Sequence, residues 1–309
     1  MKKKNRLKLH KKNFMILCLT IIVLIGSVTL LTRMVVKEIS HKNKPQKTLS
    51  TKEIKLEELN NIDKKVNYFN YNYLDRYINY KKKNNNLSDK QIVLNVNMNL
   101  DYKFYEKTIP SKYLNKEYIL VNKYYYVGEK YVPENLESLP LSYSRSGMKL
   151  TNVAKSALEE LINAAKKDNM TILVTSSYRS YEYQVKLYNQ YVEENGKEEA
   201  DTYSARPGYS EHQTGLAVDI HNGKKVYTDF ENTEEFNWMQ ENAYKYGFIL
   251  RFPKDKVNET GYIYESWHYR YVGKDIAKYI HKNNISFEEY YARLIKNNCA
   301  YHLMIINLL

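Results

Sequence analysis

The segment SEHQTGLAVDI, residues 210–220, contains a polar loop followed directly by an apolar alternation. After Gly215, apolar side chains recur at every second position, at Leu216, Val218 and Ile220. Such alternation is typical of a strand with one buried face. On a single helix, the seven-residue spacing of His212 and Asp219 would bring both to one face, but the glycine and the alternation favour a loop that enters a strand. We therefore expect Asp219 to point away from the apolar side of that strand.

The rest of the C-terminal half is a mixture of helices and strands around this segment. Apolar residues recur at helical spacing after an N-cap at Thr151 or Asn152. Ser180 caps a second helix that Gly196 closes, and Gly247 ends a third. In chain order, we expect helices at 153–165, 181–194, 236–246, 275–283 and 287–296, and strands at 170–175, 216–220, 248–251 and 267–272. Because helices and strands do not alternate regularly, the pattern predicts an α+β fold with a small antiparallel sheet flanked by helices.

The N-terminal half is less regular. Residues 91–98, QIVLNVNM, alternate apolar and polar side chains and predict a further strand. Three prolines punctuate residues 100–145, where we expect irregular structure with short strands. Residues 33–86 are interpreted as a linker or juxtamembrane region, of which 33–60 is polar and rich in Lys. Residues 61–86 are rich in Asn, Tyr and Lys, and part of them is expected to be helical. The folded domain is therefore expected at 87–295, with a tail of unknown role at 296–309.

An apolar stretch near the N-terminus predicts a membrane anchor. Residues 14–32 contain no charged side chain, and nineteen residues of helix are about enough to cross a bilayer core of roughly 30 Å. Seven Lys and Arg residues precede the stretch within 1–13, which should keep that arm in the cytoplasm and the C-terminal part outside. A cleavable signal peptide is the alternative, but its apolar core typically has about 7–15 residues and ends at small residues. The stretch is instead followed by Arg33, which favours an uncleaved transmembrane helix in the cell membrane.

The distribution of charge argues against nucleic acid as a partner. The formal net charge is +13, but residues 1–49 hold twelve Lys and Arg against one acid, a net charge of +11. Residues 50–309 hold thirty-six Lys and Arg against thirty-four Asp and Glu, a net charge of +2. The part of the chain outside the arm therefore has no basic field that would attract a polyanion. The sequence gives no indication of the oligomeric state.

A second short segment, Glu265-Ser266-Trp267-His268, completes a set of side chains suited to a metal. The two segments together offer two imidazoles, one carboxylate and a further glutamate beside the last imidazole. Zinc held by three protein ligands keeps a fourth position open, whereas structural zinc is usually closed by four ligands, mostly cysteine. A carboxylate beside such an open position can help to activate water. Spacing alone does not establish the site, because a single histidine is more often an ordinary polar or core residue.

Separated elements of this sequence resemble the VanY family of zinc D,D-carboxypeptidases. They are SYRS at 177–180, the segment at 210–220 with its serine, histidine, glycine and aspartate, and Glu265-x-x-His268, in the order of the family. The family belongs to a wider group with the VanX dipeptidases, the L,D-carboxypeptidases of bacterial cell walls and the zinc domain of hedgehog proteins. The resemblance covers roughly residues 87–295 and is strongest over 170–275.

The resemblance implies a role for each matching position. His212, Asp219 and His268 would be the ligands of Zn2+. Glu265 would be the general base that takes a proton from the attacking water and later gives one to the leaving amine. Arg179 would face the scissile carbonyl and stabilise the developing oxyanion.

Further positions match residues that contact substrate in relatives. Gln184 and Ser210 would form hydrogen bonds with the substrate, although a capped helix and a tight loop also use these residue types. Trp267 and Tyr209 would either wall the pocket or pack in the core.

The function implied by the resemblance is that of a membrane-anchored zinc D,D-carboxypeptidase, with its catalytic domain outside the cytoplasm. It would remove the terminal D-alanine from peptidoglycan stem peptides. An L,D-carboxypeptidase acting on tetrapeptide stems would share every residue named above, as would an endopeptidase whose groove is open at both ends. A non-catalytic, zinc-stabilised module that binds the cell wall is a further alternative, which the presence of both Glu265 and Arg179 disfavours.

Overall fold

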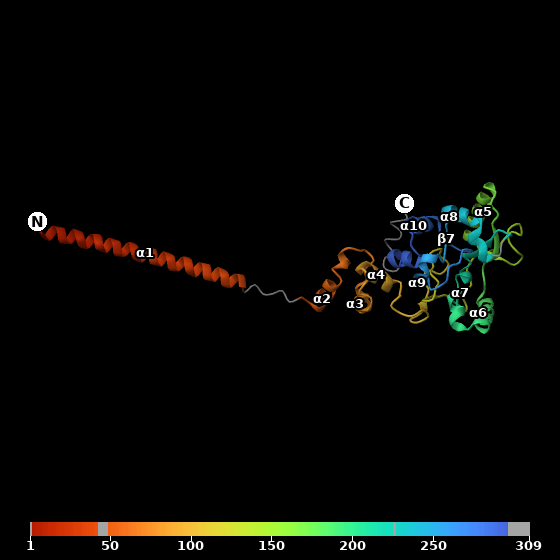
Figure 1. Ribbon diagram of the computed structural model, residues 1–309, viewed down its shortest axis with the longest axis horizontal. Helices are drawn as coiled ribbons and strands as arrows, with labels where there is room; N and C mark the ends of the chain where they lie inside the picture. The colour runs from red at the N-terminus through yellow and green to blue at the C-terminus, as the bar shows by residue number, and fades with distance from the viewer. Residues whose placement is uncertain (1, 43–48, 225–226, 296–309) are drawn as a thin grey trace. The chain divides into compact units, whose positions relative to one another are not determined.

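The computed structural model describes residues 2–42, 49–224 and 227–295, so the tail expected at 296–309 lies outside the described residues. The chain divides after Ile54 into two compact units. The first contains α1 (Lys2–Lys42), a helix of 41 residues (Figure 1). Within the described residues, one stretch is long and apolar enough to cross a membrane, Asn13–Lys37 in α1. The anchor expected at 14–32 lies inside this stretch, and its insertion into a membrane stays a prediction.

The second unit begins at Lys55, within the first of a group of helices, in a region where the sequence predicted a linker. These elements are α2 (Thr51–Glu58), η1 (Ile62–Lys64), η2 (Tyr71–Tyr73), α3 (Leu74–Lys83) and α4 (Asp89–Asn97). They form a core of their own around Leu59, Tyr77 and Ile92, which are fully buried, and Ala292 near the other end of the described chain packs into the same core. The compact unit therefore starts well before residue 87, the boundary that the sequence predicted. Leu, Ile, Val and Tyr side chains, dispersed among Lys and Asn, provide the buried surface.

The strand predicted at 91–98 is wrong, because this segment forms α4. The Ser88 hydroxyl accepts a hydrogen bond from the Gln91 N–H, and the Gln91 side chain accepts one from the Ser88 N–H. This reciprocal capping box starts a helix. Ile92 and Val93 are adjacent in sequence and are both 0% exposed, which a strand with one buried face would not allow. The local alternation thus hid a helix that is buried on most of its circumference.

The centre of the second unit is an antiparallel sheet of four strands in the order β5-β6-β8-β7. The strands are β5 (Leu173–Ser176), β6 (Ala217–His221), β7 (Phe248–Leu250) and β8 (His268–Tyr271). All four lie where the sequence predicted strands, although β5 begins at Leu173 rather than at Met170. The predicted small antiparallel sheet is therefore confirmed.

The two faces of the sheet differ in character. Val218 and Ile220 of β6 pack into the main apolar core with α5 (Asn152–Lys167) and α8 (Glu234–Asn242). Asp219 lies between them, and the two-residue period of a strand turns it to the opposite face, as the alternation predicted. His268 and Arg270 of β8 share that polar face, because Tyr269 between them belongs to the apolar core. The sheet therefore separates an apolar layer from the side where the predicted site residues gather.

The remaining helices surround the sheet (Figure 1). Ser180 caps α6 (Tyr181–Asn195) through a hydrogen bond to the Tyr183 N–H, and Gly196 closes it, as predicted. The other helical elements are α7 (Lys197–Tyr203), η3 (Glu211–Thr214), η4 (Tyr227–Asn232), η5 (Ala243–Tyr246), η6 (Lys254–Lys256), α9 (Val257–Thr260), α10 (Lys274–Asn283), α11 (Phe287–Tyr290) and the π-helical turn η7 (Tyr291–Ile295). The short strands are β1 (Ile109–Pro110) paired with β2 (Tyr125–Tyr126), and β3 (Leu136–Ser138) paired with β4 (Lys149–Thr151).

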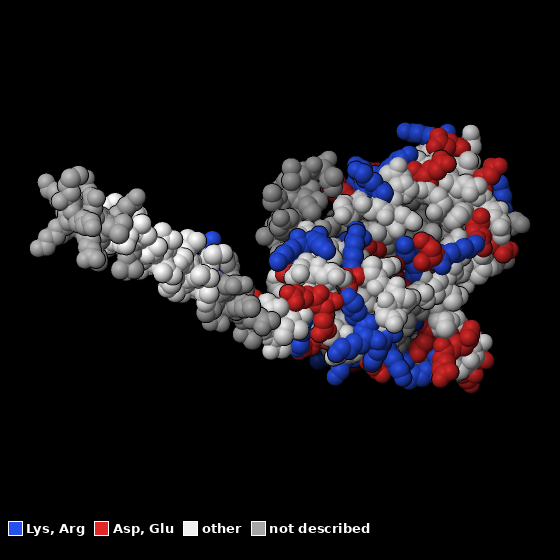
Figure 2. Space-filling view, turned by 60° about the vertical axis from the view of Figure 1, so that its left-hand side comes forward, with Lys and Arg blue, Asp and Glu red and all other residues white. Residues whose placement is uncertain are grey.

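The surface of the second unit carries charges of both signs. On the face shown in Figure 2, Lys and Arg side chains lie among Asp and Glu side chains. This agrees with the near balance of thirty-six basic and thirty-four acidic residues within 50–309. Recognition by this unit should therefore depend on local sites rather than on a long-range field.

Candidate active site

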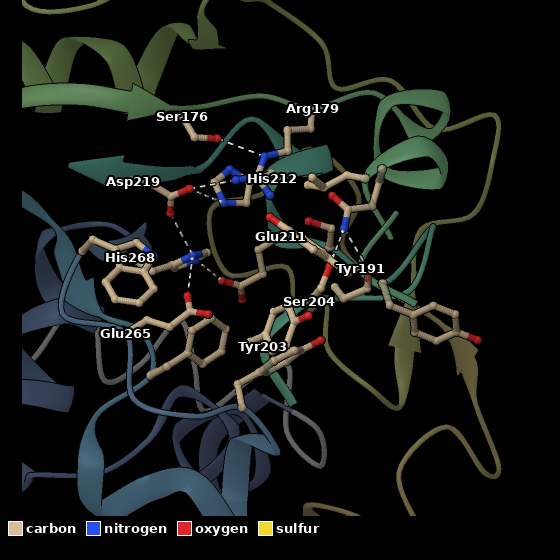
Figure 3. Close-up of a pocket in the computed structure, with 18 of the residues that line it drawn as sticks. Ser176, Arg179, Tyr191, Tyr203, Ser204, Glu211, His212, Asp219, Glu265 and His268 are labelled. Atoms are coloured by element: carbon tan, nitrogen blue, oxygen red, sulfur yellow. Dashed lines mark hydrogen bonds and ion pairs between the residues drawn. The ribbon is translucent and has the colours of Figure 1, made fainter. Parts of the chain in front are cut away.

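The predicted site residues meet on the polar face of the sheet (Figure 3). His212 lies on η3, Asp219 lies in the middle of β6, and His268 begins β8. Asp219 and His268 are direct cross-strand neighbours. Gly215, with a φ of 66°, makes the left-handed turn from η3 into β6, and a β-carbon there would lie 2.9 Å from the Leu136 side chain. The glycine in the segment at 210–220 therefore allows its histidine and its aspartate to face each other.

The side chains of His212, Asp219 and His268 could hold a metal ion. One ligand atom from each lies within 4.8 Å of the others, and all three side chains are buried. His212 Nε2 is 3.4 Å from Asp219 Oδ2, and His268 Nδ1 is 3.2 Å from Asp219 Oδ1. In the described part of the chain, Asp219 Oδ1 has no hydrogen-bond partner, although buried carboxylate oxygens normally have one. Two imidazoles and one carboxylate form a donor set that catalytic zinc accepts, so these residues fit zinc.

The main chain fixes the orientation of His212. Its Nδ1 lies 2.7 Å from the carbonyl oxygen of Ser177, just after β5. A carbonyl oxygen can only accept a hydrogen bond, so Nδ1 carries the proton and Nε2 presents its lone pair to Asp219. Burial and the nearby Arg179 lower the pKa of His212. Both effects favour the neutral ring that a metal ion requires.

Glu265 lies beside these residues on the loop before β8. The His268 N–H donates a hydrogen bond to the Glu265 carbonyl oxygen, and this turn brings Glu265 Oε2 to 3.4 Å from His268 Nδ1. The Glu265 side chain is buried, and this burial raises its pKa to about 8 against the opposing effect of His268. A carboxyl group with a pKa near neutrality can both take and give a proton. We refer below to His212, Asp219, His268 and Glu265 as the metal centre.

Arg179 approaches the metal centre from the start of α6. Its Nη2 donates to Asp219 Oδ2 at 2.8 Å, and its Nε donates to Ser176 Oγ at 2.9 Å. Burial would raise the pKa of Asp219, but the imidazole of His212, then that of His268 and the guanidinium of Arg179 outweigh it and hold this pKa well below its usual range. Asp219 is therefore ionised, and Arg179 places a fixed positive charge beside it.

These side chains line a cavity of about 460 Å³. Gln184 and Ser210, which the sequence predicted to bind substrate, both line it and are both buried. Gln184 Nε2 donates to the Ala205 carbonyl oxygen at 2.8 Å, and within the described residues its Oε1 has no partner. Trp267 and Tyr209 also lie in the wall, which favours the pocket interpretation over core packing. Further aromatic side chains complete the wall, namely Tyr183, Tyr191, Tyr203, Tyr227, Phe252 and Tyr262.

A buried ion cluster next to the metal centre was not predicted. Glu211 Oε1 accepts hydrogen bonds from Arg251 Nε at 2.8 Å and Arg270 Nη1 at 2.9 Å, and Arg251 also pairs with Glu288 of α11 at 2.6 and 2.9 Å. Each of the four side chains is at most 4% exposed. Burial would raise the pKa of Glu211, but the two arginines outweigh it and lower this pKa. We refer below to Glu211, Arg251, Arg270 and Glu288 as the ion cluster.

Comparison with known sequences finds relatives that share this region. The VanY family, described as D-alanyl-D-alanine carboxypeptidase, matches residues 147–274. The putative carboxypeptidase YodJ of Bacillus subtilis is 41% identical over 184 residues, which cover 57% of this chain and 67% of that protein. A D-alanyl-D-alanine carboxypeptidase of Enterococcus faecalis is 41% identical over 142 residues, which cover 43% of this chain and 52% of that protein. The chain thus spans between about half and two thirds of the length of these curated relatives.

Solved structures resemble the second unit as well. The LdcB LD-carboxypeptidase is 38% identical with a TM-score of 0.57, over 61% of this chain and 91% of that chain. A mutant of the vancomycin resistance D,D-pentapeptidase VanY, solved in complex with Zn(II), is 36% identical with a TM-score of 0.50, over 56% of this chain and 98% of that chain. The mixed fold of helices and a small sheet is therefore that of VanY structures.

Proposed function

The chain belongs to the VanY family of zinc carboxypeptidases, and from this premise we propose that it removes the terminal D-alanine from peptidoglycan stem peptides. The observation that supports this proposal best is the buried metal centre, with Glu265 3.4 Å from His268 at the wall of a cavity. A module that only binds the cell wall would not need a carboxyl group with a pKa near neutrality at that position. The family description as D-alanyl-D-alanine carboxypeptidase supports the same reaction.

The metal site would use His212 Nε2, a carboxylate oxygen of Asp219 and His268 Nδ1 as ligands. A zinc ion bound there would polarise the scissile carbonyl and lower the pKa of a water molecule from about 15.7 toward about 7. The VanY pentapeptidase in complex with Zn(II) supports zinc as the metal. The hydrogen bond from His212 Nδ1 to the Ser177 carbonyl would hold the first imidazole in the tautomer that binds.

Glu265 would act first as general base and then as general acid. Its carboxylate would take a proton from the water whose oxygen forms the new bond to the carbonyl carbon. When the C–N bond breaks, the protonated carboxyl would give that proton to the amine of the departing D-alanine. Burial favours the protonated form of the Glu265 carboxyl, which would help it to hold the proton between the two steps.

Three further side chains would hold the substrate. Arg179 would stabilise the oxyanion, because its guanidinium has five N–H donors and uses two of them on Asp219 and Ser176. Gln184 and Ser210 line the cavity and would bind polar groups of the peptide. The apolar helix α1 would hold the enzyme at the outer face of the cell membrane, where the wall is made.

A second candidate is an L,D-carboxypeptidase that trims tetrapeptide stems. It is supported by the likeness to the LdcB LD-carboxypeptidase, whose TM-score of 0.57 exceeds the 0.50 of the D,D-pentapeptidase. The two activities require the same hydrolytic chemistry and differ in the residue that precedes the scissile bond.

Product analysis by mass spectrometry would separate these activities. The full chain in detergent, loaded with zinc, would be incubated with purified pentapeptide and tetrapeptide muropeptides in parallel. Loss of one alanine from the pentapeptide alone is the expected result, whereas loss from the tetrapeptide alone would assign L,D-carboxypeptidase activity. If zinc binds and neither substrate changes, carboxypeptidase activity is refuted.

A further inference from the structure

Glu211 uses its two carboxylate oxygens differently. Oε1 accepts hydrogen bonds from both Arg251 and Arg270. Oε2 points toward His268, and 3.7 Å separates it from His268 Nε2 (Figure 3). Within the described residues, neither of these two buried atoms has a hydrogen-bond partner. Because buried polar atoms are rarely unpaired in folded proteins, the gap between them requires a physical explanation.

The chemistry of an imidazole ligand supplies one. His268 Nδ1 faces Asp219 and Glu265 at 3.2 and 3.4 Å, so Nδ1 is the atom that would bind zinc. A neutral ring that binds through Nδ1 must carry its proton on Nε2. Ligating histidines almost always donate that second N–H to a carboxylate, a carbonyl or water. Glu211 Oε2 is a carboxylate oxygen in the direction where the Nε2 proton would point.

The surrounding structure holds Glu211 in this orientation from several elements. His268 and Arg270 share one face of β8, so the strand directs both toward the same carboxylate. The Arg251 N–H donates to the His268 carbonyl oxygen at 3.1 Å, which fixes Arg251 beside His268. Arg270 Nη2 also donates to the carbonyl oxygens of Glu117 and Ile119. The carboxylate of Glu211 therefore cannot rotate away without breaking two charged hydrogen bonds.

We propose that Glu211 is a positioning residue for the metal site, whose Oε2 accepts the Nε2 proton of His268 and so directs the unprotonated Nδ1 toward the metal. The inference rests on the proposed zinc site and adds to it a carboxylate outside the ligand set. A shift of about 0.8–1 Å would convert the 3.7 Å separation into a charge-assisted hydrogen bond of about 2.7–2.9 Å. The ion cluster would thereby connect a zinc ligand to α11 through Arg251 and Glu288.

The competing role for Glu211 is simple neutralisation of two buried arginines. The substitution Glu211→Gln separates the two roles. The glutamine carbonyl oxygen would stay with Arg251 and Arg270, and its NH2 group would face His268 Nε2. A donor cannot accept the ring proton, so His268 would move its proton to Nδ1 and lose its ability to bind zinc there. The matched control is Glu288→Gln, which removes one negative charge from the same ion cluster but leaves Glu211 Oε2 in place.

The test measures zinc affinity of the full chain in detergent, by competition with a chromogenic chelator, together with the thermal midpoint of each variant. We expect Glu211→Gln to weaken zinc binding by about 10–100-fold, the usual effect of losing such a partner. Glu288→Gln should lower the thermal midpoint while changing zinc affinity much less. Equal losses of affinity in the two variants would overturn the proposal. An unsubstituted chain that binds no zinc would instead refute the proposed function itself.

A second measurement keeps the proposal testable if Glu211→Gln does not fold. In the zinc-loaded chain with 15N-labelled histidine, the NMR spectrum should contain a slowly exchanging proton on His268 Nε2, assigned by its loss in His268→Asn. A hydrogen bond to Glu211 predicts this slow exchange, because the proton is buried and held by a carboxylate. A His268 ring that is protonated on Nδ1, or an Nε2 proton that exchanges as fast as that of an exposed histidine, would overturn it.

Discussion

The ion cluster and the metal centre are two groups of buried charge that lie side by side and differ in how their charges balance. In the ion cluster, two guanidinium groups face two carboxylates, so the positive and negative charges balance. In the metal centre, two carboxylates face two imidazoles, which carry no fixed positive charge. Each group has one buried carboxylate oxygen without a hydrogen-bond partner among the described residues, Glu211 Oε2 and Asp219 Oδ1. Since both groups are buried to a similar extent, burial alone does not separate a structural cluster from a reactive one.

This difference in charge balance indicates which of the two buried groups is suited to a reaction. A buried cluster whose charges match has no net charge left over, and its main effect is on the stability of the folded state. In the metal centre, the carboxyl of Glu265 has its pKa raised to about 8, and three ligand atoms converge on a site that a cation would complete. Perturbed groups of this kind are typical of functional sites. Each prediction below changes one pairing and measures whether stability or turnover responds.

The largest effect is expected from Glu265→Gln. The amide has nearly the same shape but cannot take a proton from water, so kcat should fall by about 10²–10⁴-fold, the range for loss of a general base. Zinc affinity should remain close to that of the unsubstituted protein, because Glu265 is not one of the three proposed ligands. Turnover would be followed by release of D-alanine, and bound zinc by chelator competition. A variant that keeps zinc and also keeps near-normal kcat would remove Glu265 from the reaction.

Substitutions in the ion cluster should lower the free energy of unfolding rather than the turnover. Arg251→Met leaves Glu288 and one side of Glu211 without their partner in a dry environment, and the free energy of unfolding should fall by about 3–5 kcal/mol. Combining Arg251→Met with Glu288→Leu removes both charges of that pair and should restore much of the loss. The exposed pair of Lys274 and Glu160, at 2.8 Å, is the control, and Lys274→Met should cost less than about 1 kcal/mol. Urea unfolding measures all of these, and equal costs for the buried and the exposed pair would contradict the comparison.

The sequence predicted the metal centre better than the ion cluster. The reason is that the partners in the ion cluster are far apart in the sequence and meet only in the folded structure. His212 and Asp219 belong to one short segment, and His268 lies on the adjacent strand, so local patterns and one strand pairing bring them together. Glu211 was within the same segment, but its arginine partners are 40 and 59 residues away on other strands or loops. Nothing in the sequence near Glu211 indicates which distant arginine will face it.

The same distinction applies to the fold. The helix α6 was predicted because Ser180 and Gly196 mark its ends, and β6 because its apolar residues alternate strictly. Part of 61–86 was expected to be helical, but the compact core before residue 87 was not predicted, because its buried residues are dispersed among polar ones and gain a core only by packing on one another. At α4, Ser88 and Gln91 have the spacing of a capping box, whereas the alternation after them is typical of a strand. Local end signals were therefore more reliable here than a short periodic pattern.

The smallest effect is expected at Lys123, a buried charge outside both groups. It is 3% exposed, its Nζ donates to the carbonyl oxygens of Asp201 and Gly261, and within the described residues it forms no ion pair. Burial lowers the pKa of Lys123 to about 8, and the charge of Asp201 offsets this only in part. An unfolded lysine keeps its proton up to about pH 10.4, so between pH 8 and that value the unfolded state binds more protons than the folded state.

Because the unfolded state binds more protons between pH 8 and about 10.4, the free energy of unfolding should rise with pH in this range. The expected rise is about 1–3 kcal/mol relative to Lys123→Met. The measurement is urea unfolding of both proteins at several pH values between 7.5 and 10, with the exposed Lys82→Met as the control for general titration. If the curves of Lys123→Met and the unsubstituted protein run parallel, Lys123 loses its proton at the same pH in both states. Hydrogen bonds to carbonyl oxygens would then be enough to keep a buried lysine charged. The comparison would in that case rest only on the metal centre and the ion cluster.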